Sequence, residues 1–310
     1  MQLIPLIEKE LLENKIMFFA VPFITTLMII IMLVVSAFSM EVHTGNSTLF
    51  LDIRYLEDMD ASARQWYLNS LFNDTTLLLR IIFVLIAIHY ASNTFYSARR
   101  DGSELFWRSL PINPWLETAA KLITILAIIP LVFFGFIVIV QLANLALVSY
   151  LGSDHGISLL EHVWLPAQLH KVWLYGLGYI LVDFFWLAPM LCWFMLWSTL
   201  AKRAPFIISL IPLVLIAVGE QFLFSSAHLA KGVIMHSVPN ELLAWITNLP
   251  KRMLPSELID FVAKATNIPL LNSTDFMERI LSKSFWFGIL ITIPIFIATV
   301  KIHDKSSNHD

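Results

Sequence analysis

His89, Asp183 and Glu220 are among the ionisable residues that lie inside apolar stretches of a length that can cross a bilayer. A charged side chain near the centre of a bilayer costs about 2.5–3.5 kcal/mol or more. Asp183 is therefore expected to face a partner side chain or a cavity, where it could contact a transported molecule. The alternative is a structural hydrogen bond to a neighbouring helix, which we favour for His89, whereas Glu220 lies towards the end of its stretch and can reach water. These three residues are the predicted transport path.

A second group of residues lies in the connection between two apolar stretches, at positions 97–115. Ser103 can cap a short helix, which Leu110-Pro111 would end. Leu105 to Trp107 would give this helix an apolar, aromatic tip. Such a tip is unfavourable in water, so it would either insert into a groove on a partner protein or rest among lipid headgroups.

Metal and nucleophile chemistry is weakly represented. Five potential metal ligands lie between the third and fourth apolar stretches, but their spacing matches no tight ligand motif: Asp154, His155, Glu161, His162 and His170. No nucleophile–base constellation stands out, and no GxxxxGK[ST] phosphate loop occurs. We therefore expect no catalytic residue, metal or cofactor on this chain, and any ATP and magnesium would belong to another chain.

The composition places these residues in a membrane. Of the 310 residues, 58% are hydrophobic and 14% are charged, against about 25% charged in an ordinary soluble domain. The apolar residues are grouped in blocks long enough to span a bilayer. The net charge of −3 gives no bulk attraction to nucleic acid. The predicted fold class is therefore an all-α integral membrane protein, with membrane lipid as its surroundings.

Six blocks predict six transmembrane helices in a single domain, 1–310, since about 20 residues cross the hydrocarbon core. The predicted spans are residues 17–38, 76–96, 122–150, 172–200, 205–224 and 284–300. Segments 40–75 and 228–283 are predicted on the outer side, the second with short helices that form a small helical segment.

Residues 1–15 are predicted to form an amphipathic helix at the membrane interface. Leu3, Ile4, Ile7 and Leu11 share its apolar face. The charged residues are expected largely off that face: Glu8, Lys9, Glu10 and Glu13.

Basic residues in the short connections set the predicted orientation. Residues 97–121 hold four basic residues, and the link between the fourth and fifth spans holds Lys202 and Arg203. Segment 41–74 holds six acidic residues against two arginines. Because basic residues of short loops stay in the cytoplasm, both termini and the 97–121 connection are predicted to be cytoplasmic.

The 97–121 connection resembles the permease family of ABC type-2 exporters. Members carry a charged pair, Gly-Thr/Ser, Glu, apolar residues, Leu-Pro-Ile/Val and a Lys that opens the third span. The matching residues here are Arg99-Arg100, Gly102-Ser103, Glu104, Leu105-Phe106-Trp107, Leu110-Pro111-Ile112 and Lys121. The run from Ser103 to Pro111 is especially similar to a bacterial branch. One departure is that Glu104 follows Ser103 directly, where many members have an intervening residue.

The resemblance implies the permease subunit of an exporter in the bacterial inner membrane. Two copies of the chain would pair above two copies of a separate ABC ATPase and move an amphipathic or hydrophobic cargo. The connection would be the coupling helix, whose implied ATPase contacts are Arg100, Asp101, Gly102, Ser103, Glu104, Leu105, Phe106, Trp107, Arg108, Leu110 and Pro111. Two alternatives stay open: an ion-driven secondary transporter, a class that usually shows internal repeats and several intramembrane charges, and a non-transporting membrane assembly subunit driven by an ATPase.

Overall fold

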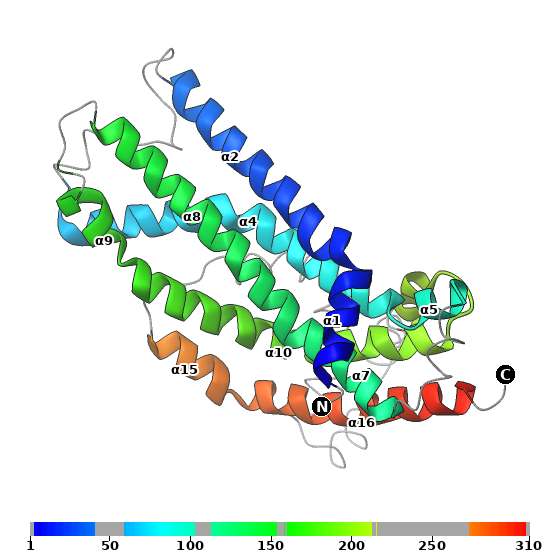
Figure 1. The fold of residues 1–310 in the computed structure, drawn as a ribbon. Coiled ribbons are helices and arrows are strands. Elements are labelled where there is room, and N and C mark those ends of the chain that lie inside the picture. Colours follow the sequence, from blue (N-terminus) through cyan, green and yellow to red (C-terminus); the bar gives the residue numbers. More distant parts are fainter. Residues whose placement is uncertain are drawn as a thin grey trace.

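The computed structural model describes residues 3–40, 59–102, 113–153, 158, 160–212, 215 and 273–307. Every regular element among these residues is a helix (Figure 1). The elements are α1 (Leu3–Glu13), η1 (Ile16–Ala20), α2 (Val21–Met40), α4 (Ala61–Asn93), α5 (Tyr96–Arg100), α7 (Pro114–Ile123), η2 (Thr124–Ile128), α8 (Ile129–Ser153), η3 (Leu160–Trp164), α9 (Leu165–Ala167), α10 (Leu169–Leu200), α15 (Ser273–Leu281) and α16 (Lys283–Ser307). Residues 205–212 are also helical.

Five helical stretches are long and apolar enough to cross a membrane. They are Ile16–Ala37, Ala61–Asn93, Pro114–Ser153, Leu160–Leu200 and Phe285–Lys305. The predicted fold class is confirmed at this level: the chain is an all-helical, multi-pass membrane protein. Of the predicted fifth span, 205–224, only residues 205–212 and 215 are described, so the sixth crossing stays a prediction.

The helices extend beyond the predicted spans. Helix α4 starts at Ala61, not near residue 76, because Asp60 caps it: the carboxylate accepts hydrogen bonds from the Ser62 hydroxyl at 2.6 Å and the Ala63 N–H at 3.1 Å. These two bonds, the first being the larger effect, lower the pKa of Asp60. At about 1.5 Å per residue, the 33 residues of α4 measure about 50 Å, longer than the hydrocarbon core of about 30 Å. Part of the segment predicted on the outer side, residues 61–75, is thus one helix with the span.

Among the described residues, each of the three π-helical turns comes just before an X-Pro step. The steps are Val21-Pro22, Ile129-Pro130 and Leu165-Pro166, directly after η1, η2 and η3. Proline lacks an N–H, and its ring clashes with the carbonyl four residues earlier. A wider π turn relieves that clash, so η1 leads directly into α2 and η2 leads directly into α8.

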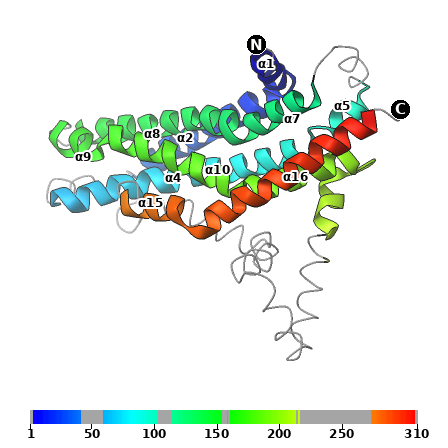
Figure 2. The ribbon, with the colours of Figure 1, turned by 90° about the horizontal axis from the view of Figure 1, so that it is seen from below.

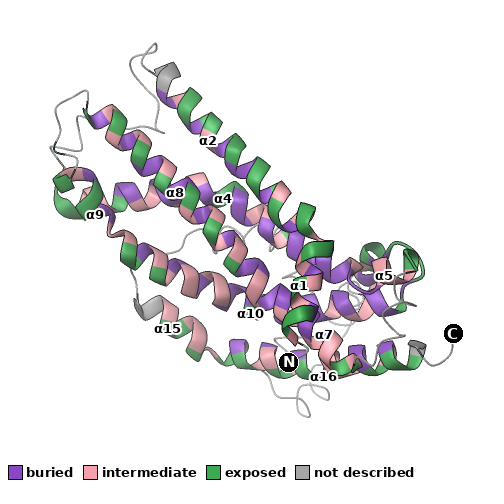
Figure 3. Ribbon diagram, in the orientation of Figure 1, coloured by how far each residue is buried: buried purple, intermediate pink, exposed green. Residues whose placement is uncertain are grey.

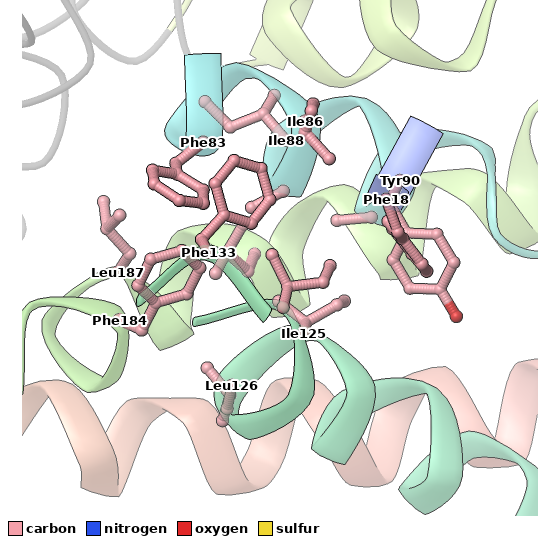
Figure 4. Packing of buried hydrophobic residues seen from close by; sticks show 14 of the residues in the cluster. Phe18, Phe83, Ile86, Ile88, Tyr90, Ile125, Leu126, Phe133, Phe184 and Leu187 are labelled. Carbon is pink, nitrogen blue, oxygen red and sulfur yellow. The ribbon is translucent and has the colours of Figure 1, made fainter. Parts of the chain in front are cut away.

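Two hydrophobic clusters hold the helices together. The larger one joins α4, α8 and α10 around residues such as Phe83, Phe133 and Leu187 (Figure 4). The smaller one lies near the start of α4 and the start of α10, around Phe72 and Tyr179. Figure 3 shows buried residues where α4, α8 and α10 face each other, and exposed residues along the outer side of α2.

Candidate functional site

The predicted coupling helix leaves the described chain after Gly102 and returns at Asn113. Its two flanks, α5 and α7, lie towards the same end of the bundle as α1 and the C-terminal ends of α10 and α16 (Figures 1 and 2). We call this end the loop end. Eight of the eleven predicted contact residues lie outside the described residues: Ser103, Glu104, Leu105, Phe106, Trp107, Arg108, Leu110 and Pro111.

The three described contact residues form an exposed helix stop. The Asp101 N–H donates to the Ser97 carbonyl at 2.9 Å, which closes α5. Gly102 has φ +70°, a left-handed conformation that costs glycine little. Arg100 pairs with Asp101 at 2.9 Å, but both side chains are more than half exposed, so the pair adds little stability. This stop fixes where the chain enters the loop.

Arg99 anchors the first flank to the C-terminal end of α10. Its guanidinium donates to the carbonyl oxygens of Ser198 and Thr199 and to that of Ala201 at 3.1 Å. The last carbonyls of a helix have no partner within the helix, and a cation there is favourable to the helix dipole. The Ser198 hydroxyl also accepts a hydrogen bond from the Phe95 N–H at 3.0 Å. The chain entering the loop is therefore tied to the last turn of α10.

The second flank begins with a regular helix start. The Asn113 side chain accepts a hydrogen bond from the Trp115 N–H at 2.9 Å, and Pro114 occupies the first turn of α7. An Asn cap followed by Pro at the first position is a common helix opening. Helix α7 therefore starts at a defined residue immediately after the loop.

Lys121 of α7 makes a buried ion pair with α1. Lys121 Nζ lies 2.6 Å from Glu10 Oε1, and the two side chains are 3% and 5% exposed. Tyr90 of α4 donates its hydroxyl to Glu10 Oε2 at 2.5 Å. In Figure 4, the Tyr90 ring lies beside Phe18, with its hydroxyl at the edge of the hydrophobic cluster. This ion pair joins α1, α4 and α7 directly behind the loop.

Glu117 extends the network to the last helix. Its Oε2 lies 3.4 Å from His303 Nε2 of α16, and its Oε1 lies 3.9 Å from Lys121 Nζ. The His303 ring lies against Phe95, with ring centroids 4.6 Å apart. The two flanks of the loop are thus connected to α1, α4, α10 and α16.

Two further residues of α1 add charge at the loop end. Lys9 Nζ and Glu13 Oε1 are 3.8 Å apart. Burial, and then the neighbouring Lys121, lower the pKa of Lys9. Burial raises the pKa of Glu13, although Lys9 acts in the opposite direction. The loop end therefore gathers several charged side chains that pair with one another.

Sequence reasoning missed most of this network. The sequence did not reveal which side of α1 is buried against the bundle: Glu10 and Leu6 are the buried residues of α1, and Ile4 is 76% exposed. Glu10 is buried because Lys121 and Tyr90 satisfy its carboxylate. A signal that could have pointed to the network is Lys121 at the start of an apolar stretch.

The three residues of the predicted transport path are not brought together among the described residues. His89 is exposed and faces a groove beside α1. Asp183 pairs with Arg279 of α15 at 3.0 Å, so its partner is a neighbouring helix. Glu220 lies outside the described residues.

No group of three or more His, Cys, Asp or Glu residues able to hold a metal occurs among the described residues. Of the five potential ligands, Asp154 and His155 lie outside the part that the structure describes. His162 Nδ1 lies 3.0 Å from the Ser158 carbonyl oxygen.

Comparisons with protein families, curated proteins and solved structures find no match to this chain. The fold and the hydropathy of its helices define a multi-pass membrane protein. Any more specific function has to be argued from the loop end.

Proposed function

We propose that the chain is the permease subunit of an ABC exporter, with the 103–112 loop as its contact to a separate ATPase. Two copies of the chain would form the path in the bacterial inner membrane, with both termini and the loop end in the cytoplasm. ATP and magnesium would be bound by the partner, and the cargo would be amphipathic or hydrophobic.

One observation carries the proposal: both flanks of the loop are fixed into the helix bundle by charged groups. Arg99 holds the end of α10, and Lys121 holds Glu10 of α1. A loop that only rested among lipid headgroups would need no such anchors. A loop that receives a mechanical displacement does need them, since unanchored flanks would absorb the displacement.

The mechanism follows from the anchored flanks. ATP favours the closed form of the ATPase pair, and binding shifts the population towards the conformer that fits it. A displacement of the loop is then transmitted through Arg99 to α10 and through Lys121 to α1 and α4. The relative movement of these helices would alternate the exposure of a path between two copies of the chain.

The test is to purify the tagged full-length chain from its native membranes and measure co-purified ABC ATPase and its activity. Trp107→Glu and Leu105→Glu place a charge in the predicted contact and should lower ATPase recovery about 30-fold, as expected when a residue contributing about 2 kcal/mol is lost from an interface. Trp66→Glu is the matched control, because Trp66 is 71% exposed on α4, outside the loop.

Equal recovery of the ATPase with Trp107→Glu and Trp66→Glu would contradict the proposal. A complex that hydrolyses ATP but moves no cargo would instead identify a non-transporting assembly subunit. Topology is tested separately with Trp107→Cys and an impermeant thiol reagent. The one natural cysteine, Cys192, is buried, so labelling reports on position 107.

A further inference from the structure

A groove of about 560 Å³ lies between the α1–α2 corner and α4. Its volume is within the range of about 300–1,000 Å³ that is typical of small-molecule sites. One wall comes from Glu13, Asn14 and the first residues of the long helix that begins at Ile16. The other wall comes from α4, between Ile82 and His89.

The lining of the groove changes from polar to apolar along the direction of α4. His89 lies close to the end of α4 at the loop end, with Glu13 and Asn14 across from it. Ile82 and Leu85 lie up to seven residues earlier in α4, which is about 10 Å farther from the loop end. A molecule that matches this lining has a polar group at the loop end and an apolar chain that extends into the bilayer.

The polar end of the groove offers two groups to a ligand: the carboxylate of Glu13 and the imidazole ring of His89. Glu13 is the one carboxylate among the described residues that line the groove. Lys9 Nζ lies 3.8 Å from Glu13 Oε1, and the Glu13 side chain is 49% exposed, so its carboxylate is accessible to a bound cation. Burial raises the pKa of Glu13, and a bound ammonium would oppose that effect. The His89 ring can donate an N–H to a phosphate oxygen.

We infer that this groove binds a phospholipid whose headgroup carries a primary ammonium and a phosphate, of the phosphatidylethanolamine type. The ammonium lies at Glu13, the phosphate at His89, and one acyl chain along Ile82 and Leu85. The site goes beyond the proposed export function and does not rest on it, because a resident lipid would occupy the groove whether or not an ATPase binds. It also gives His89 a ligand that is not the cargo.

The test uses the purified full-length chain in phosphatidylcholine vesicles with a trace of photoactivatable phosphatidylethanolamine or phosphatidylglycerol. Adducts are mapped by mass spectrometry to the peptides around Ile16 and Leu85. Phosphatidylethanolamine should label these peptides roughly two- to fivefold more than phosphatidylglycerol, the range expected for one partly exposed ion pair. The quaternary ammonium of phosphatidylcholine cannot donate a hydrogen bond to Glu13, so it competes poorly.

Matched variants separate the groove from general lipid contact. Glu13→Gln should reduce phosphatidylethanolamine labelling to the phosphatidylglycerol level, whereas Glu8→Gln, an exposed residue of the same helix, should not. Leu85→Trp should fill the groove and lower labelling by both lipids. Leu78→Trp is its control, because Leu78 and Leu85 are 47% and 53% exposed on α4 and only Leu85 lines the groove.

The melting temperature of every variant is measured first, and Glu13→Gln alone suffices if Leu85→Trp does not fold. Equal labelling by the two lipids, or equal labelling of Glu13→Gln and Glu8→Gln, would overturn the headgroup assignment. Unchanged labelling of a folded Leu85→Trp would overturn the groove as the site.

Discussion

The Glu10–Lys121 ion pair provides the sharpest test of how the loop end is held together. Glu10→Gln keeps the size of the side chain and removes its charge. Lys121 Nζ would then lose a carboxylate at 2.6 Å in a position where its side chain is only 3% exposed. The amide oxygen of Gln could still accept a hydrogen bond from Tyr90, so the variant isolates the loss of charge.

The expected destabilisation follows from the burial of the pair. Removing one partner of a buried ion pair costs about 3–5 kcal/mol, because the other charge is left uncompensated. Glu117 Oε1 remains 3.9 Å from Lys121 Nζ, which places the cost at the low end, about 3 kcal/mol. For a chain of this size, about 2 °C of melting temperature corresponds to 1 kcal/mol. Glu10→Gln should therefore lower the melting temperature by about 6 °C.

The assay is thermal unfolding of the purified chain in a mild detergent at one fixed scan rate. Glu8→Gln removes the same charge from an exposed position of α1 and should leave the melting temperature unchanged. The double variant Glu10→Leu with Lys121→Met replaces both charges by apolar groups. It should recover most of the lost stability, since apolar replacement of a whole buried pair is often neutral or stabilising.

Two results would refute this reasoning. A melting temperature of Glu10→Gln equal to that of Glu8→Gln would mean that the Glu10 carboxylate is not buried against Lys121. A double variant whose loss equals the sum of Glu10→Leu and Lys121→Met would mean that the two residues do not interact.

Three further predictions concern other contacts. Arg99→Ala should release the last carbonyls of α10 and speed hydrogen exchange at residues 198–203 by about tenfold or more, as expected for charged hydrogen bonds, whereas Arg100→Ala, at an exposed pair, should not. Gly178→Val should displace α15, because a Cβ at Gly178 would lie 3.1 Å from Phe276 Cε2. Faster hydrogen exchange in residues 273–281 would report this displacement. Adding Phe276→Ala to the same chain should restore the protection from exchange. The Ser62 hydroxyl, with the backbone N–H of Ala63, lowers the pKa of Asp60. The ionised cap therefore stabilises α4 at pH values above the unfolded pKa of about 3.9. This stabilisation is lost as the pH falls through the lower pKa of the folded state. Exchange protection of the first turn of α4, corrected for intrinsic rates, should accordingly drop below about pH 4 in the natural chain, and Asp60→Asn should show no such drop.

The long helices could be predicted because each apolar run is long enough to cross the hydrocarbon core of a bilayer, which takes about 20 residues. The additional length of α4 could not, because residues 61–75 include Asn69, Asn73 and Asp74 and are typical of a polar connection. Their helix is stabilised by packing of Tyr67, Leu68 and Phe72 against residues of α8 and α10. That partner surface is distant in sequence, so local hydropathy does not reveal it.

At the loop end, too, the contacts between residues that are distant in sequence could not be predicted. The helix stop at Asp101-Gly102 and the helix start at Asn113-Pro114 are local features, and the sequence indicates both. The partner of Lys121 is Glu10, 111 residues away, and the Arg99 contacts are about as distant. A single sequence carries no record of such pairs, so the burial of Glu10 against Lys121 was not predicted.

Helix α10 joins the loop end to a second polar contact. Asp183 lies fifteen residues before Ser198, or about 22 Å along the helix, and accepts a hydrogen bond from Arg279 of α15 at 3.0 Å. The Arg279 guanidinium also lies 5.3 Å from the centre of the Tyr179 ring. Pro189 lies between the two contacts. A proline removes one helical hydrogen bond, and helices bend most readily at such a position. If the loop receives the movement of an ATPase, α10 would transmit it from Arg99 to α15, and any bending at Pro189 would reduce the displacement that reaches α15. On this reasoning, Asp183 acts through α15, with Arg279 as its partner.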